Sequence, residues 1–256
     1  MSKDPIRLFV TKKRFPQQVL SQVLLTDEEL HYCQRVVRQG PGAVVEILDG
    51  AGQVAYGVLA GFGKNAYVKV ESIDVYPNLL PKISLYVGML KGDKMDWVIE
   101  KTTELGVDRI VPVVSRYSVV GDEVMHNKVY PRQERWQKIA EAAARQSNRT
   151  ILPEIGSPLF LQDALHSSGS GAARLIFHEK TPNAHWPIGN YLRNTESIDL
   201  FIGPEGGFSQ EEILLAEEKG CLCCGLGSLR LRAETAAVFA VGLCRYSTIY
   251  KDSEFV

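Results

Sequence analysis

Short apolar or alternating runs dominate the first 76 residues. Four of them favour β-strands, because they are rich in β-branched side chains or alternate between apolar and polar positions. These runs are 7–10, 43–48, 53–59 and 66–73. The capping-box pattern Thr26-x-x-Glu29 opens a helix that we expect to run through His31 towards Val37. Strands of this length and spacing are typical of a small barrel.

After this region the pattern changes to strands separated by helices. Tyr76–Pro81 contains two prolines, which stop both helix and central strand and so indicate a linker. The apolar runs that favour strands are 83–89, 110–114, 175–178, 198–202 and 222–226. The helical patterns are 94–105, 132–147, 211–219 and 234–250. This alternation predicts an α/β fold with a parallel sheet covered on both faces over residues 77–256.

Composition and charge restrict the class of protein. The chain of 256 residues is 45% hydrophobic, which is enough for a sizeable core. It has no run of about 18 apolar residues and no apolar stretch of signal-peptide length near its start, so we expect a cytoplasmic protein without a membrane span. The formal net charge is −1, but residues 77–151 carry twelve Lys and Arg against nine Asp and Glu. A polyanion would meet the first 150 residues first, although an ordinarily solvated surface explains so modest an excess equally well.

The five cysteines do not have the spacing of a metal site. Cys221, Cys223 and Cys224 form C-L-C-C, without a second cysteine or histidine pair nearby. We interpret this cluster as a buried strand with free thiols, and we expect no metal.

Two loops carry the chemistry that the sequence offers. Each follows an apolar strand, and ligands bind outside the carboxyl ends of parallel strands. The first, Gly203-Pro204-Glu205-Gly206-Gly207, has three glycines that allow the backbone to approach a ligand closely, and Ser209-x-x-Glu212 then opens a helix. The second loop is 227–236. A tight strand-to-helix turn is the alternative for the first loop, and Gly225-Leu226-Gly227 lacks the third glycine of a dinucleotide fingerprint.

These loops, with other ordered motifs, resemble a known class of enzymes. The sequence is similar to the SPOUT class of methyltransferases, and more narrowly to the bacterial 16S ribosomal RNA uridine-N3 methyltransferase family. The motifs that carry the resemblance are Arg7-x-Phe9, Lys91-Gly92-Asp93-Lys94-Met95, Lys101-x-x-Glu104-Leu105-Gly106, Arg116-x-Ser118-Val119, Ala144-Arg145-Gln146-Ser147-x-Arg149, Gly203–Gly207, and Leu226-Gly227 with Leu231–Ala236. The likeness covers nearly the whole chain. Ser228 and Leu229 stand where the family usually has Pro-Arg.

The resemblance implies a fold and a reaction. Residues 1–76 would form a PUA-like RNA-binding β-barrel, and residues 77–256 a SPOUT methyltransferase domain with a trefoil knot near its carboxyl end. S-adenosylmethionine would donate a methyl group to uridine N3 in 16S ribosomal RNA of the small ribosomal subunit. The resemblance also implies a homodimer that needs no metal. The apolar segment Val238–Tyr250 fits a partner helix, and it fits a core-facing helix equally well.

Roles for particular residues follow from the two loops and the reaction. The expected donor-binding residues are Phe177, His178, Glu179, Ile202, Gly203, Pro204, Glu205, Gly206, Gly207, Leu226, Gly227, Leu229, Arg230, Leu231, Thr235 and Ala236. Our hypothesis gives Arg232 the stabilisation of charge on the uracil oxygens, and Glu234 the N3 proton or the orientation of the base. Glu234 near a helix start is also explained by the helix dipole, and His178 by an ordinary strand end.

Basic residues are the candidates for phosphate contacts. They are Arg7, Arg35, Arg38, Arg116, Arg145 and Arg149. Arg145 and Arg149 share a helix face if the helix continues that far. Two other functions remain open, namely a non-catalytic RNA-binding or ribosome-assembly protein of the same fold, and a related knotted methyltransferase that acts on another RNA. Binding of S-adenosylmethionine would separate an enzyme from a pure binding module.

Overall fold

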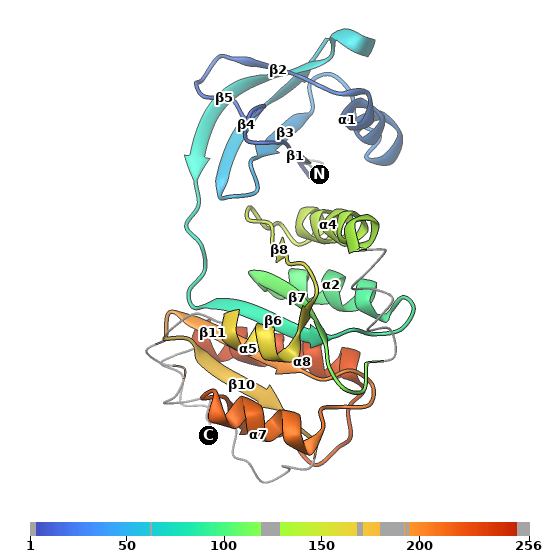
Figure 1. Ribbon diagram of the computed structural model, residues 1–256. Coiled ribbons are helices and arrows are strands. Elements are labelled where there is room, and N and C mark those ends of the chain that lie inside the picture. Colours follow the sequence, from blue (N-terminus) through green and yellow to red (C-terminus); the bar gives the residue numbers. More distant parts are fainter. Residues whose placement is uncertain are drawn as a thin grey trace. The chain divides into compact units, whose positions relative to one another are not determined.

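The computed structural model describes residues 4–61, 63–118, 129–167, 171–179, 192 and 195–249. The chain forms two compact units (Figure 1). The first consists of Met1–Asn78 and Ala144–Leu152, and the second of Leu79–Ala143 and Pro153–Val256. The sequence-based division after residue 76 does not include the return of 144–152 to the first unit, because this return depends on contacts between distant parts of the chain.

The first unit is built on a curled five-stranded sheet. Its elements are β1 (Ile6–Phe9), β2 (Gln22–Leu24), α1 (Asp27–His31), a π-helical turn (Tyr32–Val36), β3 (Val44–Leu48), β4 (Gln53–Ala60), a short 3₁₀ turn (Gly63–Asn65) and β5 (Tyr67–Val75). The strand order is β1-β3-β4-β5-β2, with β1 and β3 parallel and the other pairs antiparallel. Alternate side chains such as Ile6, Leu8, Val45 and Ile47 fill one core beneath the sheet. The expected strands are therefore present, and β2 is an additional edge strand.

The predicted capping box begins α1. The Thr26 side chain accepts a hydrogen bond from the Glu29 amide at 3.2 Å, and the Glu29 carboxylate accepts one from the Thr26 amide at 2.8 Å. These bonds satisfy amide groups that have no partner inside the helix. The helix continues as a π-helical turn to Val36, so the predicted extent is confirmed although the last turns are wider.

Arg7 connects β1 with the returning segment of the first unit. Its side chain is 7% exposed and pairs with Glu46 at 2.8 Å. The guanidinium also donates to the carbonyl oxygens of Ala144, Arg145 and Arg149 at 3.4, 3.4 and 3.0 Å. We expected Arg7 to contact RNA, whereas in the structure its hydrogen-bond donors are turned inward and used within the unit.

The second unit is a parallel sheet with helices between its strands. Its elements are β6 (Lys82–Gly88), α2 (Lys94–Glu104), β7 (Arg109–Val114), α4 (Val129–Gln146, whose last turn lies in the first unit), β8 (Glu154–Ile155), β9 (Leu159–Phe160), α5 (Leu161–Ser167), β10 (Ala173–Phe177), β11 (Ser197–Ile202), α7 (Gln210–Glu218), β12 (Leu222–Cys224) and α8 (Ala233–Ile249). The strand order is β12-β10-β11-β6-β7-β8, and β9 also pairs with β7. All pairs are parallel, as the alternation of strands and helices predicts.

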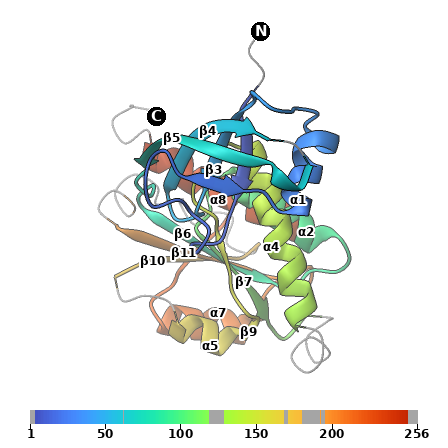
Figure 2. The same cartoon turned by 90° about the horizontal axis from the view of Figure 1, so that it is seen from above.

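Helices cover both faces of this sheet. Side chains of α2, α4 and α8 join one core with alternate residues of the central strands, such as Leu85 and Leu200. On the other face α5 and α7, which lie together in Figure 2, pack against Tyr86 and Phe201. The Tyr86 and Phe201 rings stack with centroids 4.6 Å apart. Because both faces of the sheet are buried, the sequences of its strands are continuous runs of mostly apolar residues.

The cysteine cluster belongs to the edge strand β12. Cys221 and Cys224 are buried and Cys223 is half-buried, and all five cysteines of the chain are free thiols. The interpretation as a thiol-rich strand is confirmed. Within the described part of the chain, no group of three or more His, Cys, Asp or Glu side chains is arranged to hold a metal ion. No helix among the described residues is long and apolar enough to cross a membrane.

Candidate active site

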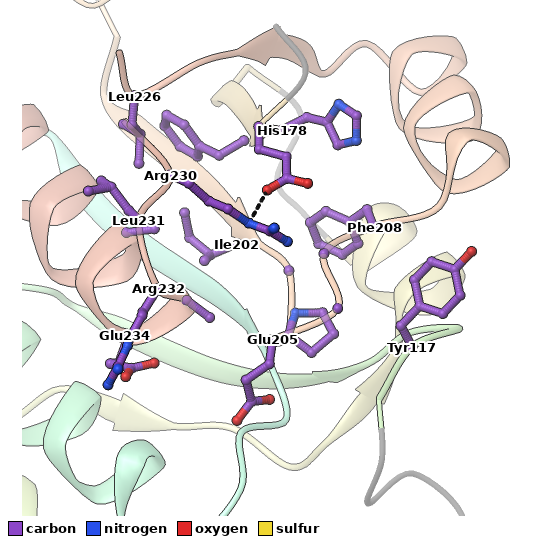
Figure 3. A pocket seen from close by; sticks show the side chains of 18 of the residues that line it. Tyr117, His178, Ile202, Glu205, Phe208, Leu226, Arg230, Leu231, Arg232 and Glu234 are labelled. Atoms are coloured by element: carbon purple, nitrogen blue, oxygen red, sulfur yellow. Dashed lines mark ion pairs between the residues drawn. The ribbon is translucent and has the colours of Figure 1, made fainter. Parts of the chain in front are cut away.

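One cavity of about 670 Å³ lies at the carboxyl edge of the parallel sheet (Figure 3). The segments that follow β7, β10, β11 and β12 line it, together with Lys94 at the start of α2. Its volume suits a ligand of cofactor size, for which cavities of roughly 300–1,000 Å³ are usual. The parallel sheet accounts for this position, because the loops after its strands all emerge at the same edge.

The glycine-rich loop after β11 has a geometry that requires glycine. Gly207 has a φ of +72°, and its amide donates to the Pro204 carbonyl at 2.8 Å, which closes a tight turn. A Cβ atom at Gly206 would lie 2.7 Å from the Cβ of Tyr117, and one at Gly203 would lie 2.9 Å from the carbonyl carbon of Gly207. Compact folding of the loop therefore explains its three glycines, and it leaves the backbone open to the cavity.

The loop after β12 forms the opposite wall. Gly227 has a φ of +98°, which turns the chain towards the cavity. Arg230 then extends outward and pairs with Glu179 of the segment after β10 at 2.8 Å, as the dashed line in Figure 3 marks. Both side chains are largely exposed, so the pair contributes little to stability. Leu229 beside it is 79% exposed at the edge of the cavity.

Two acidic side chains and one lysine meet inside the cavity. The Nζ atom of Lys94 lies 2.9 Å from Oε1 of Glu205 and 3.9 Å from Oε2 of Glu234. The Lys91 amide also donates to Oε1 of Glu205 at 3.2 Å. Partial burial by itself would raise the pKa of Glu205, but the hydrogen bonds from Lys94 and the backbone outweigh it and lower that pKa below its ordinary value. Glu205 is therefore a carboxylate at neutral pH.

Glu234 lies in the first turn of α8 and has an incompletely satisfied carboxylate. Its side chain is only 14% exposed. Its Oε2 atom is buried and has no hydrogen-bond partner among the described residues, because Lys94 remains 3.9 Å away. A buried acceptor without a partner is costly unless a ligand or water completes it. This atom is the clearest sign that a polar group binds at this point of the cavity.

The cavity brings together nearly all of the residues that we expected to bind the donor. Among the sequence-based candidates, those that line it are Phe177, His178, Glu179, Ile202, Gly203, Pro204, Glu205, Gly206, Gly207, Leu226, Gly227, Leu229, Arg230, Leu231, Arg232, Glu234 and Ala236. Thr235 differs, because it lies exposed on α8 and does not line the cavity. The amide of His178 donates to the Cys224 carbonyl at 3.0 Å, which continues the pairing of β10 with β12 one residue beyond the end of β10.

Some lining residues were missed as site residues by the sequence reasoning. The most informative are Lys94, Tyr117 and Phe208. Lys94 and Tyr117 each come a few residues after a strand, namely β6 and β7. Ligands bind beyond the carboxyl ends of parallel strands, so the position of Lys94 and Tyr117 after such strands is the signal that identifies them.

The candidate RNA-binding arginines occupy different environments. Arg35 and Arg38 are exposed, and exposed Arg116 lines the cavity and pairs with Glu211 at 3.0 Å. Arg145 is half-buried, with its guanidinium carbon 5.1 Å from the ring centroid of Tyr32. The helix α4 ends at Gln146, so half-buried Arg149 does not share a helix face with Arg145.

Comparison with known families agrees with this combination of fold and site. Residues 78–245 match the model of an RNA methyltransferase domain, and residues 25–71 match that of an RNA methyltransferase PUA domain. A curled first unit and a parallel sheet with a glycine-rich loop at its carboxyl edge are thus the parts of an RNA methyltransferase.

Individual relatives make the assignment more specific. The chain is 30% identical over 231 residues to ribosomal RNA small subunit methyltransferase E of Bacillus subtilis, which covers 88% of this chain and 90% of that protein. The Synechocystis protein of the same name is 32% identical over 231 residues, covering 88% and 74%. A crystal structure of the Neisseria gonorrhoeae protein of that name, bound to S-adenosyl methionine, has a TM-score of 0.84 at 27% identity, covering 96% of this chain and 98% of that one. The chain belongs to the ribosomal RNA small subunit methyltransferase E family, within the SPOUT class.

Proposed function

We propose that this protein transfers a methyl group from S-adenosylmethionine to N3 of a uridine in 16S ribosomal RNA of the small ribosomal subunit. One observation carries the proposal. The cavity at the carboxyl edge of the sheet combines a glycine-rich loop with a buried carboxylate atom of Glu234 that has no hydrogen-bond partner among the described residues. The relatives that bear a small-subunit ribosomal RNA methyltransferase name support the same reaction.

The residues that line the cavity fit S-adenosylmethionine. Backbone groups of Gly203–Gly207 and the apolar side chains of Ile202, Leu226 and Leu231 provide hydrogen bonds and a slot for an adenine ring. Carboxylates in the same cavity, including Glu205, suit a cationic ligand. When bound, this donor supplies a methyl group and keeps the electron pair of the broken carbon–sulfur bond.

The acceptor nitrogen requires help from the protein. Uracil N3 carries a proton, so a base must take this proton as the nitrogen forms its bond to the methyl carbon. We propose that the Glu234 carboxylate accepts this proton and later releases it to water. Arg232, exposed beside Glu234 at the cavity, stabilises the negative charge that grows on the uracil oxygens. Glu234 lies in the first turn of α8, which places its carboxylate at the edge of the cavity.

Exposed arginines support binding of the RNA. Arg35 and Arg38 in the first unit and Arg116 at the cavity present guanidinium groups to solvent, and we assign them to phosphate contacts. Arg145 and Arg149 are weaker candidates because both are half-buried. Since the small ribosomal subunit is the proposed substrate, the proposed location is the cytoplasm.

We also propose that the protein acts as a homodimer with the knotted chain path of its class. The support for a dimer is a stripe of large apolar side chains on α8 that are about half exposed. Phe239 and Tyr246 are 47% and 49% exposed and are seven residues apart, with half-buried Leu243 between them. Residues at this spacing share a helix face, and an exposed aromatic face of this kind suits a partner subunit.

The test is methyl transfer from labelled S-adenosylmethionine to small ribosomal subunits that lack native modification, followed by mass spectrometry of the nucleosides. We expect label in 3-methyluridine of 16S ribosomal RNA. Label in another nucleoside would overturn the choice of acceptor. Absence of label with intact donor binding would indicate another RNA, and absence of both would favour a non-catalytic RNA-binding protein.

A further inference from the structure

We propose that Lys94 is a positioning residue, which uses one ammonium group to link the donor-binding loop with the carboxylate that accepts the proton. The inference rests on the proposed function, since it assigns a part in the same reaction. Its basis is the position of Nζ, 2.9 Å from Glu205 and 3.9 Å from Glu234.

Lys94 is placed by the chain segment that follows the central strand β6. The strand ends at Gly88, and Lys94 is the first residue of α2. The same segment supplies the Lys91 amide, which donates to the Glu205 atom that Lys94 contacts. Glu205 therefore has two donors from one segment, and this segment anchors the tip of the glycine-rich loop.

The second partner of Lys94 is held differently. Glu234 comes from the start of α8, and its carboxylate is 14% exposed against 29% for Glu205. At 3.9 Å the lysine is too far for a hydrogen bond, but it is close enough to stabilise a carboxylate in a partly buried site. Oε2 of Glu234 has no hydrogen-bond donor among the described residues, so its lone pairs are available to accept a proton.

A single cation between two carboxylates also fixes their spacing. Without Lys94, the like charges of Glu205 and Glu234 would repel each other and favour a larger separation. Figure 3 shows both carboxylates on the same side of the cavity. Lys94 thereby holds the donor-binding loop and the proton-accepting carboxylate at a constant distance from each other. This distance matters because an error of about 1 Å between reacting groups costs on the order of 100-fold in rate.

Two substitutions separate the two links. Glu205→Gln breaks only the connection to the loop, so it should raise KM for the donor more than it lowers kcat. Lys94→Met breaks both connections, and we expect a further fall in kcat of about 10-fold to 100-fold. Lys94→Arg, which can reach both carboxylates, should restore most of the activity.

Lys82→Met is the matched control, because exposed Lys82 lies at the opposite end of β6. Equal kinetics for Lys94→Met and Glu205→Gln would overturn the proposal and leave Lys94 as a loop anchor.

A second measurement does not depend on activity. Lys94→Met leaves the Glu234 carboxylate buried without a cation, so Glu234→Gln should raise the melting temperature in that background relative to its effect in the wild type. Loss of the helix-dipole contribution is the same in both backgrounds and cancels in the cycle. Additive changes in melting temperature for Lys94→Met and Glu234→Gln would exclude the link between Lys94 and Glu234.

The failure of the proposed function would be distinguishable from the failure of this inference. If the wild-type protein did not methylate RNA, the proposed function would be wrong. The melting-temperature cycle and donor binding by the variants would still decide whether Lys94 joins the two carboxylates.

Discussion

The backbone of Pro204 packs directly against Gly88, so that a Cβ atom at residue 88 would lie 2.3 Å from the Pro204 nitrogen. Gly88 is the last residue of β6, and Pro204 begins the tight turn of the glycine-rich loop after β11. The close approach of these two segments fixes the start of the loop that lines the candidate active site.

Gly88→Ala should therefore disturb the donor site. The added methyl group meets backbone atoms and the proline ring, which cannot move aside as a flexible side chain would. We expect a loss of donor affinity of about 5-fold to 150-fold, on the order of 1–3 kcal/mol, measured by calorimetric titration. Gly40→Ala is the control, since a Cβ atom there meets nothing within 4 Å. Normal donor binding by the Gly88 variant would show that the loop adapts.

Glu234→Gln should abolish most methyl transfer while the protein stays folded. The amide cannot accept the N3 proton, and loss of a general base costs about 10²-fold to 10⁴-fold. The measurement is kcat on small ribosomal subunits, with circular dichroism to verify the fold. Glu179→Gln is the comparison, because Glu179 lines the same cavity but only pairs with exposed Arg230. A Glu234 variant with nearly normal kcat would leave the carboxylate as a helix-dipole group.

Arg245→Met should destabilise the second unit strongly. Arg245 is 6% exposed, pairs with Asp108 at 3.1 Å and donates to the carbonyl oxygens of Pro81 and Gly106. Its removal leaves a buried carboxylate and two carbonyls without these donors, at a cost of about 3–5 kcal/mol. Urea unfolding measures the loss. Glu154→Gln, which breaks the more exposed pair with Arg109, should change stability by less than about 1 kcal/mol.

Replacing Arg35 and Arg38 by glutamine should weaken RNA binding in a salt-dependent manner. Each lost phosphate contact reduces the slope of log affinity against log salt by about 0.7 to 0.9. Filter binding to 16S ribosomal RNA at several salt concentrations gives this slope. Lys219→Gln, an exposed site at the end of α7, is the control. An unchanged slope in the double variant would remove both arginines from the RNA surface.

Stability should fall at alkaline pH because buried thiols resist ionisation. Burial raises the pKa of Cys33 to about 11, against about 8.5 for an exposed thiol. The folded state then retains a proton that the unfolded state loses, so this contribution is complete below about pH 8.5 and declines as pH rises towards 11. The decline is at most about 1.4 kcal/mol per pH unit for each thiol. Unfolding free energies between pH 8 and 10.5 test this, and Cys33→Ala should have a shallower slope. Equal slopes would contradict the raised pKa.

Much of the fold follows from local patterns. The capping boxes at Thr26 and Ser209 and the apolar runs of the central strands specify elements through interactions between neighbouring residues, which a sequence displays directly. The glycine-rich loop 203–207 and the turn at Gly227 were recognisable for the same reason, because positive φ angles and close backbone approach restrict these positions to glycine. Parallel topology then indicates that the loops meet at one edge of the sheet.

Contacts between distant segments were decided only by the tertiary structure. The sequence marks Arg7 as a cation, yet its burial against the carbonyls of residues 144–149 depends on a return of the chain that no local pattern encodes. Lys94, likewise, becomes the link between Glu205 and Glu234 only when three separate strand ends are assembled. The sequence determines which chemical groups are available, whereas desolvation and pairing depend on the residues that folding brings around them, and these decide whether a charged side chain binds RNA, stabilises a core or positions a reacting group.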